Sequence, residues 1–258
     1  MGQVGAPAVF LDTNVLYGGL NSDIFLSLAT ADKPTFKARW TEYVFQELRD
    51  NLYENYVARG KTDREKRTLS ESVSRRIEAM RRVGERFFVY DWEPLVPVVA
   101  EYVEDPDDTP ILAGAVRAEA SILVTENTSD FNTALISRYF GIAVRNESDF
   151  LNDMFQQRKQ WMLDGLSEML ESHNNPPQDF RGLVKRMREI DSLRSFSQTI
   201  EAEAVRRYNI AANARLSHRG VQGRDAKGRF TAIQRYDSDI QLDCSEGVDV
   251  WTSDGNMY

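Results

Sequence analysis

Short apolar runs that end in polar residues recur along the first half of the chain. Val9–Leu11 ends at Asp12, Ser121–Val124 ends at Thr125, and Ile142–Val144 forms a third run. Such runs of β-branched, aliphatic or aromatic residues are typical of buried parallel strands, and the stretches between them carry apolar residues at helical spacing. This alternation predicts an α/β fold of three layers, with a central parallel sheet flanked by helices.

Helical spacing and end signals predict most of the segments between these strands. Thr62 and Glu65 form a capping-box pattern that begins a helix over Asp63–Glu85. Phe36–Trp40 is either a brief strand or an extended link, and Phe87–Tyr90 is predicted as a strand. The other predicted helices are residues 21–31, which Asn21 would cap, 41–58 and 109–120.

Beyond residue 147 the pattern changes to helices without intervening strands. Apolar residues at helical spacing predict helices over 150–171, 179–190 and 192–208, with a break at Asn174–Pro177. The remaining segment is basic at first and then acidic, with few apolar residues, which is typical of a flexible tail. The predicted organisation is therefore an α/β domain over 1–147, a helical domain over 148–208 and a charged tail over 209–258.

Composition excludes several kinds of site. The 258 residues include one cysteine and two histidines, so disulfide frameworks, zinc ribbons and cysteine–histidine nucleophile pairs are excluded, and any metal must take oxygen ligands. The formal net charge of -8 argues against a general nucleic-acid coat protein. Without a membrane-length apolar stretch or a secretion signal, the expected location is the cytoplasm, with no membrane partner.

Four acidic residues on separate predicted elements form the candidate site. Asp12 and Asp130 follow two neighbouring strands, Asp108 begins the helix that leads into the second of these strands, and Glu47 flanks the apolar stripe of a helix. The carboxyl ends of parallel strands meet at one edge of a sheet, where ligands bind in such folds. Each acid alone has an ordinary explanation, since Asp12 can cap a helix and Glu47 can face solvent.

Carboxylates gathered at one sheet edge oppose one another's ionisation unless a cation neutralises them. Oxygen ligands without histidine or cysteine suit Mg²⁺ or Mn²⁺, which we expect on Asp12, Asp108 and Asp130. A hard divalent ion of this kind supports hydrolysis of a phosphodiester bond. Asn14 and Thr125 are expected to orient a carboxylate or a bound water through hydrogen bonds.

Arginines are frequent in the predicted helix over Asp63–Glu85, and Arg75, Arg76 and Arg82 are candidates for contacts with RNA phosphates. The interspersed glutamates leave the alternative that this helix is an ordinary solvated surface.

Four motifs in order resemble those of the PIN domain, over about the first 147 residues. They are Leu-Asp-Thr-Asn-Val-Leu at 11–16, Gln-Glu-Leu around Glu47, Asp-Pro-Asp-Asp-Thr-Pro-Ile-Leu-Ala at 105–113 and Leu-Val-Thr-Glu-Asn-Thr-Ser-Asp-Phe at 123–131. The resemblance implies a metal-dependent nuclease whose metal-site acids are Asp12, Glu47, Asp108 and Asp130, with Asp105 and Asp107 as substitutes.

Within that family the chain is most similar to VapC-like toxins of toxin–antitoxin pairs, and residues 148–205 resemble the helical C-terminal domain of a longer subgroup. This implies an endoribonuclease that acts on RNA and is neutralised by a small antitoxin protein, with homodimer formation left open.

The sequence leaves two alternative functions for the acids and one hypothesis for the tail. A PIN scaffold could bind RNA or protein without cleaving either. A phosphotransfer or phosphatase domain would need aspartate at position 14, where Asn14 stands. For the tail, residues 236–258 would fold over the basic segment before them or compete with RNA for it.

Overall fold

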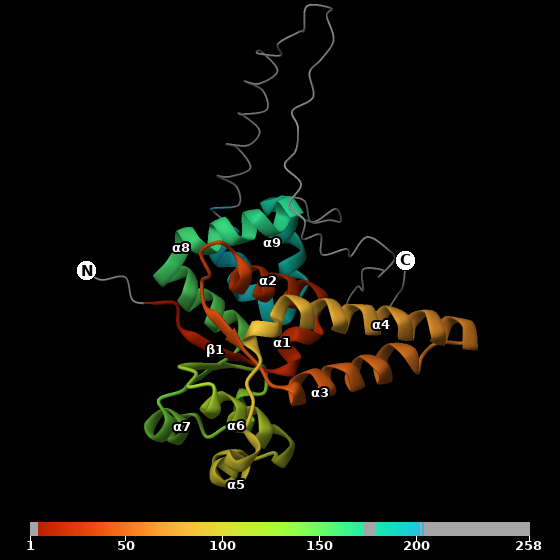
Figure 1. The fold of residues 1–258 in the computed structure, drawn as a ribbon. Helices are drawn as coiled ribbons and strands as arrows, with labels where there is room; N and C mark the ends of the chain where they lie inside the picture. The colour runs from red at the N-terminus through yellow and green to blue at the C-terminus, as the bar shows by residue number, and fades with distance from the viewer. Residues whose placement is uncertain (1–4, 173–178, 202, 204–258) are drawn as a thin grey trace, which may run out of the picture.

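The computed structural model describes residues 5–172, 179–201 and 203. The tail predicted over 209–258, the last residues of the helical domain and the hypothesis that the tail competes with RNA all lie outside these residues. Among the described elements, the α/β architecture and the C-terminal helices predicted from the sequence are confirmed (Figure 1).

Four short parallel strands form the central sheet in the order β2-β1-β3-β4. The strands are β1 (Ala8–Leu11), β2 (Lys37–Arg39), β3 (Ile122–Val124) and β4 (Ala143–Arg145). β1 pairs with β2 from Ala8 opposite Lys37 and with β3 from Val9 opposite Ile122. The carboxyl ends of the two central strands, β1 and β3, therefore lie beside each other at the same edge of the sheet.

Helices cover both faces of the sheet, and each connection between parallel strands contains at least one of them (Figure 1). The α-helices are α1 (Thr13–Tyr17), α2 (Gly19–Thr30), α3 (Glu42–Leu52), α4 (Asp63–Gly84), α5 (Val96–Val99), α6 (Thr109–Arg117), α7 (Thr133–Phe140), α8 (Glu147–Ser172) and α9 (Phe180–Arg188). The labelled one-turn segments are a π-helix, η1 (Tyr53–Val57), and five 3₁₀ turns, η2 (Glu85–Phe87), η3 (Glu93–Leu95), η4 (Ala100–Tyr102), η5 (Pro106–Asp108) and η6 (Thr128–Asp130). Residues 191–201 are also helical.

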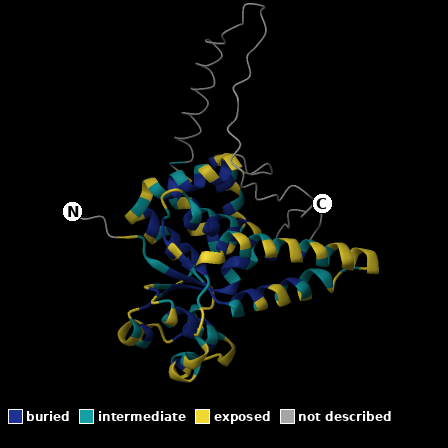
Figure 2. Ribbon diagram, in the orientation of Figure 1, coloured by how far each residue is buried: buried dark blue, intermediate teal, exposed yellow. Residues whose placement is uncertain are grey.

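The hydrophobic core runs without a break from the sheet into the C-terminal helices (Figure 2). The ring of Phe150 on α8 lies 5.6 Å from that of Phe25 on α2 and 5.1 Å from that of Phe36, measured between ring centroids. All three side chains are fully buried, and aromatic rings of this size dominate the energetics of a core. The segment after residue 147 thus packs directly against the α/β part, while the predicted division into domains stays a prediction.

Three sequence predictions are corrected by the backbone. Asn21 does not cap a helix, because α2 begins two residues earlier with Gly18 as its N-cap. Phe87–Tyr90 is not a strand, since its only ladder contact is an isolated parallel bridge from Phe88 to Trp40. The helix predicted to reach Ala58 ends as an α-helix at Leu52 and continues as the π-helical turn η1.

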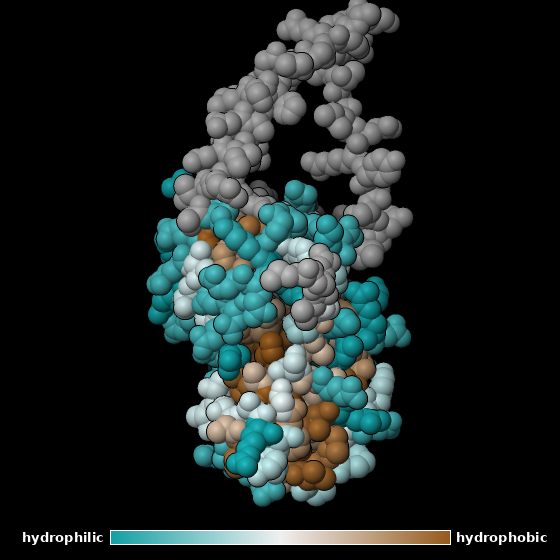
Figure 3. All heavy atoms as spheres, turned by 90° about the vertical axis from the view of Figure 1, so that its left-hand side faces the viewer, coloured by the Kyte–Doolittle hydropathy of each residue, from teal (hydrophilic) through white to brown (hydrophobic). Residues whose placement is uncertain are grey.

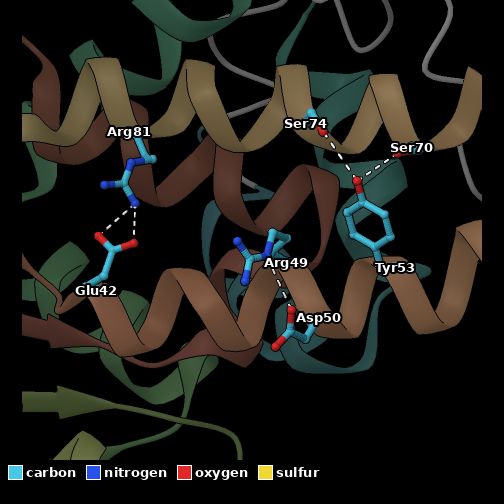
Figure 4. Close-up of polar contacts among 7 residues, drawn as sticks. All are labelled: Glu42, Arg49, Asp50, Tyr53, Ser70, Ser74 and Arg81. Carbon is cyan, nitrogen blue, oxygen red and sulfur yellow. Dashed lines mark hydrogen bonds and ion pairs between the residues drawn. The ribbon is translucent and has the colours of Figure 1, made fainter. Parts of the chain in front are cut away.

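Helices α3 and α4 lie side by side and project from one side of the molecule (Figure 1). The predicted capping box is confirmed, with Thr62 and Glu65 bonding each other's backbone N–H groups at the start of α4. Arg81 donates to both carboxylate oxygens of Glu42 at 2.6 and 2.7 Å, and the Tyr53 hydroxyl lies 2.7 Å from that of Ser70 (Figure 4). Polar contacts at both ends therefore hold the two helices in register.

The apolar surface visible in Figure 3 gathers at the lower end of the molecule, where α5, α6 and α7 lie in Figure 1. Within the described ranges, none of the helices combines the length and apolar character that a membrane crossing requires.

Candidate functional site

Asp12 lies where β1 ends, and its carboxylate is the best-held group of the site. Only 3% of the residue is exposed, and its Oδ1 accepts a 2.6 Å hydrogen bond from the backbone N–H of Thr13, so that it caps α1. Its Oδ2 accepts from the Thr125 hydroxyl at 2.7 Å and from Asn14 Nδ2 at 2.9 Å. Asp12 therefore caps α1 with one carboxylate oxygen while the other oxygen is held by side chains of the candidate site.

Asn14 and Thr125 also contact each other across the edge between β1 and β3. Asn14 Nδ2 donates to the Thr125 hydroxyl oxygen at 3.2 Å, and Asn14 Oδ1 accepts from the backbone N–H of Glu126 at 3.3 Å. Each residue thus has a second partner that fixes it where it bonds Asp12. This mutual bracing restricts the orientation of a buried carboxylate.

Burial raises the pKa of Asp12 to about 6, above its ordinary value of 3.8. Hydrogen bonds from Thr125 and Thr13 oppose this effect, while the nearby carboxylate of Glu47 adds to it. A buried carboxylate needs donors or a cation to remain ionised, and here donors offset only part of the cost.

Glu47 is tied to the same region by a residue that the sequence reasoning missed. The Thr13 hydroxyl donates to Glu47 Oε2 at 2.6 Å, so the residue after Asp12 anchors the glutamate of α3. The signal was present in the sequence, because a threonine that follows a strand-end aspartate is placed to reach a neighbouring element. Glu47 therefore turns towards the sheet edge, although it is partly exposed.

Asp108 begins α6, but its side chain makes no hydrogen bond that caps the helix. Burial raises its pKa to about 7 from 3.8, and the carboxylates of Asp12, Asp130, Asp105 and Glu47 raise it further, in that order. Neighbouring charges act on a pKa only over short distances, so the other three predicted site acids lie within electrostatic reach of Asp108.

Asp130 closes the 3₁₀ turn η6 after β3 and is partly exposed. Its backbone carbonyl accepts from the N–H of Glu104 at 2.7 Å, and Ser129 donates to its carboxylate at 3.3 Å. The first of these contacts ties the Asp130 turn to the segment just before Asp108. The two acids thereby come from connected loops.

Asp105 and Asp107, the predicted substitutes, are both exposed. Asp105 accepts from the backbone N–H of Asp107 at 3.0 Å and caps the 3₁₀ turn η5. The side chain of Asp105 therefore stabilises the loop that carries Asp108, and Asp107 takes part through its backbone N–H.

The acids act on one another electrostatically, yet among the described residues they do not form a closed ligand shell. Over the described part of the chain, no group of three or more acidic, histidine or cysteine side chains is arranged to hold one metal ion. The donor set nevertheless fits a hard divalent cation, because it consists of oxygens on carboxylates whose ionisation is opposed by burial and by one another. A cation would favour the ionised forms of both Asp12 and Asp108.

Tyr43 is a second residue that the sequence reasoning missed. It precedes Glu47 by one helical turn on α3, a spacing that places both on one face. Its hydroxyl donates to the backbone carbonyl of Asp107 at 3.1 Å. Burial raises the pKa of Tyr43, and the carboxylates of Glu47, Asp107, Asp108 and Asp12 contribute to the same shift.

The three candidate RNA-binding arginines lie in different surroundings on α4. Arg76 is partly buried, and its Nη2 donates to the backbone carbonyls of Leu16 and Tyr17 at 3.1 and 2.9 Å. This guanidinium therefore caps the end of α1 and holds α4 against it. Arg75 and Arg82 are exposed, and their contact with RNA stays a prediction.

The N-terminal part of the chain matches a known family model. Residues 8–129 match the family model described as the PIN domain, a range that includes Asp12, Glu47 and Asp108 but ends one residue before Asp130. No curated protein matches the chain, and no solved structure does.

Proposed function

We propose that the protein is an endoribonuclease dependent on Mg²⁺ or Mn²⁺, because residues 8–129 match the PIN domain, a nuclease-type fold whose members are generally metal-dependent. The proposal names Asp12, Glu47, Asp108 and Asp130 as the acids of its site. The observation that carries it is the geometry around Asp12, whose carboxylate is held by Thr13, Asn14 and Thr125, while the Thr13 hydroxyl also holds Glu47.

Asp12, Asp108 and Asp130 would hold the metal ion through carboxylate oxygens. When bound, such an ion activates a water molecule and neutralises negative charge on the phosphate during hydrolysis. Asp12 has two oxygens in different environments, since Oδ2 is bonded by two side chains and Oδ1 by one backbone N–H. Oδ1 therefore keeps more capacity for a ligand.

Side chains around the acids would position the carboxylates of Asp12 and Glu47 for the reaction. Thr125 and Asn14 fix the plane of the Asp12 carboxylate, and Thr13 holds Glu47 through Oε2, which leaves Oε1 to accept a proton from a water near the phosphate. Fixed donors of this kind reduce the rearrangement that the site must undergo during the reaction.

The test is a cleavage assay on total RNA with mapped cut ends, in the presence of Mg²⁺, of Mn²⁺ or of a chelator. Native protein should cleave only with a metal, while Asp12→Asn and Asp108→Asn should lose at least about a hundredfold in rate, as is typical when a group that stabilises the transition state is removed. Asp105→Asn is the matched control from the same loop and should retain activity, because asparagine also caps helical turns.

A PIN domain that binds RNA or protein without cleavage is the second candidate. It is favoured by one observation, namely that no three acids of the described chain are arranged to hold a single metal ion. RNA binding without cleavage under either metal would support this candidate and refute the nuclease proposal.

We further propose that the nuclease acts as the toxin of a toxin–antitoxin pair, with a small antitoxin protein as its partner. Support comes from the resemblance of its motifs and C-terminal helices to longer VapC-like toxins. Expression of native protein should then arrest bacterial growth, whereas expression of Asp12→Asn to the same level should not. Equal growth with both proteins would contradict the toxin role and leave the cleavage assay to decide on nuclease activity.

A further inference from the structure

Five aromatic side chains form two groups, each between the start of α3 and the segment after α4. The rings of Tyr43 and Trp92 lie 6.0 Å apart, those of Phe45 and Phe88 lie 5.2 Å apart, and Phe88 stacks on Tyr90 at 6.4 Å with an angle of 25° between the planes. We call these residues the aromatic strip. Tyr43 and Phe45 are two positions apart on α3 and lie on different sides of the helix, so the two groups are joined only along the chain from Tyr90 to Trp92.

Tyr90 at one end of the strip is unusually accessible. It is 66% exposed, the highest value among the large exposed hydrophobic residues of the described chain. Since one face of its ring stacks on Phe88, the exposed area lies mainly on the other face and the edges. The next residue, Asp91, has a φ of 56°, a left-handed conformation that is uncommon for residues other than glycine and marks the turn between Tyr90 and Trp92.

The group formed by Tyr43 and Trp92 leads to the acids. The Tyr43 hydroxyl bonds the carbonyl of Asp107, the residue next to Asp108, at 3.1 Å. The carboxylates of Glu47 and Asp12 also act on the Tyr43 phenol. One ring contact and one hydrogen bond therefore join Trp92 to the loop that carries Asp108.

Two arginines lie beside the strip. The Arg81 guanidinium lies 5.1 Å from the centroid of the Phe88 ring, and Arg117 Nε donates to the backbone carbonyl of Tyr90 at 3.2 Å. Their side chains are 39% and 50% exposed, so both remain accessible to an anion. Each is also near a carboxylate, Glu42 for Arg81 (Figure 4) and Asp91 for Arg117, which keeps the local charge balanced.

We propose that Tyr90 and Trp92 form a stacking platform for the bases of single-stranded RNA next to the cleaved phosphate. This inference rests on the proposed nuclease function. Aromatic faces stack on bases of any sequence, and neighbouring arginines bind the intervening phosphates, a combination typical of single-strand binding. A paired duplex hides its base faces, so the platform selects unpaired RNA.

The test measures binding of fluorescein-labelled decauridylate by anisotropy, with every protein carrying Asp12→Asn so that the probe stays intact. Tyr90→Ala should weaken binding by about fivefold or more, the lower end of what loss of one stacked base produces, whereas Tyr90→Phe should stay within about twofold. Tyr139→Ala is the matched control, since Tyr139 is 59% exposed on a different element, helix α7.

Two probes separate stacking from charge. The parent protein is the one that carries Asp12→Asn alone. An abasic oligomer with the same number of phosphates should bind the parent more weakly than decauridylate does. The same abasic oligomer should bind the parent and Tyr90→Ala equally. Trp92 gives an independent signal, because decauridylate should quench tryptophan fluorescence less in Trp92→Phe than in the parent.

The platform is refuted if Tyr90→Ala binds decauridylate as tightly as Tyr139→Ala does, or if the abasic oligomer binds the parent as tightly as decauridylate. Failure of the nuclease proposal looks different, because native protein would then leave RNA intact under both metals while Tyr90 still affected binding. Cleavage by native protein with no effect of Tyr90→Ala on binding would refute the platform alone.

Discussion

Glu147 is a buried acid at the junction between the sheet and the C-terminal helices, and replacing it with glutamine should stabilise the protein at neutral and alkaline pH. The residue is 1% exposed and begins α8. Asn21 donates to its Oε2, and a second donor of Asn21 reaches the Ser192 hydroxyl at 2.9 Å. Glu147 Oε1 and Asn21 Oδ1 are both buried without a hydrogen-bond partner among the described residues.

Burial raises the pKa of Glu147 from 4.5 to about 8. The hydrogen bond from Ser192 opposes this shift, the nearby carboxylate of Glu126 adds to it, and smaller effects come from Asn21, which opposes it, and Asp12, which adds to it. A protonated Glu147 carries an O–H donor. Such a donor can satisfy a buried oxygen of this cluster that otherwise lacks a hydrogen-bond partner.

The sign of the pH effect follows from the two pKa values. Below pH 4.5 the group is neutral in both the folded and unfolded states and costs nothing. Between pH 4.5 and about 8 only the unfolded state ionises, so the free energy of unfolding falls by about 1.4 kcal/mol per pH unit, up to about 5 kcal/mol in total. Above pH 8 both states are ionised and the loss is complete.

Glu147→Gln removes this titration and supplies an N–H donor that does not depend on pH. The assay is urea denaturation of both proteins at intervals between pH 4.5 and 8.5, followed by circular dichroism and tryptophan fluorescence. The free energy of unfolding of the variant, relative to that of native protein, should rise by several kcal/mol from pH 4.5 to 8.5. The rise should match the stability that native protein loses over the same range. Glu168→Gln, at an exposed position of the same helix, should show no such trend.

The reasoning is refuted if the stability difference between Glu147→Gln and native protein stays constant from pH 4.5 to 8.5. It is also refuted if native protein is the more stable of the two at pH 8, because Glu147 would then be stabilised in its ionised form.

Two further changes test the packing that positions the site. Arg76→Ala removes the guanidinium that bonds the last carbonyls of α1 and should lower the free energy of unfolding by about 1–3 kcal/mol, while Arg75→Ala should change it by less than about 0.5 kcal/mol, both measured by urea denaturation. Gly84→Ala would place a Cβ 1.9 Å from Trp40 Cζ2 and should lower the thermal midpoint by several degrees, through a loss of about 1–3 kcal/mol or more. An unchanged midpoint would show that α4 shifts freely relative to β2.

Much of the sheet and the position of its edge could be predicted from short-range sequence patterns. Polar residues directly follow strands β1 and β3, and parallel pairing brings the carboxyl ends of these strands together. The contact between Thr125 and Asp12 therefore follows from topology, even though 113 positions separate them. The strand predicted over Phe87–Tyr90 failed because an apolar run does not reveal whether a neighbouring strand is available. Among the described residues, the bridge partner of this segment is Trp40, which lies beyond the end of β2.

Other features depend on contacts that no local pattern contains. Asn21 has the composition of a helix cap, yet it lies within α2 and bonds Glu147, which is 126 positions away. Arg76 has the same sequence surroundings as the exposed Arg75, and only the approach of α1 decides which of the two becomes structural. Such roles follow from tertiary packing, which overrides local preferences.

The central claim is that Asp12 and Asp108 act as parts of one metal site, and Mn²⁺ binding tests it most directly. Electron paramagnetic resonance should show Mn²⁺ bound to native protein and to Asp105→Asn with similar affinity, and weakened by about tenfold or more in Asp12→Asn and in Asp108→Asn, as expected when a charged ligand is lost. Mn²⁺ binding of unchanged affinity in both Asp12→Asn and Asp108→Asn would contradict the claim, whatever the protein does to RNA.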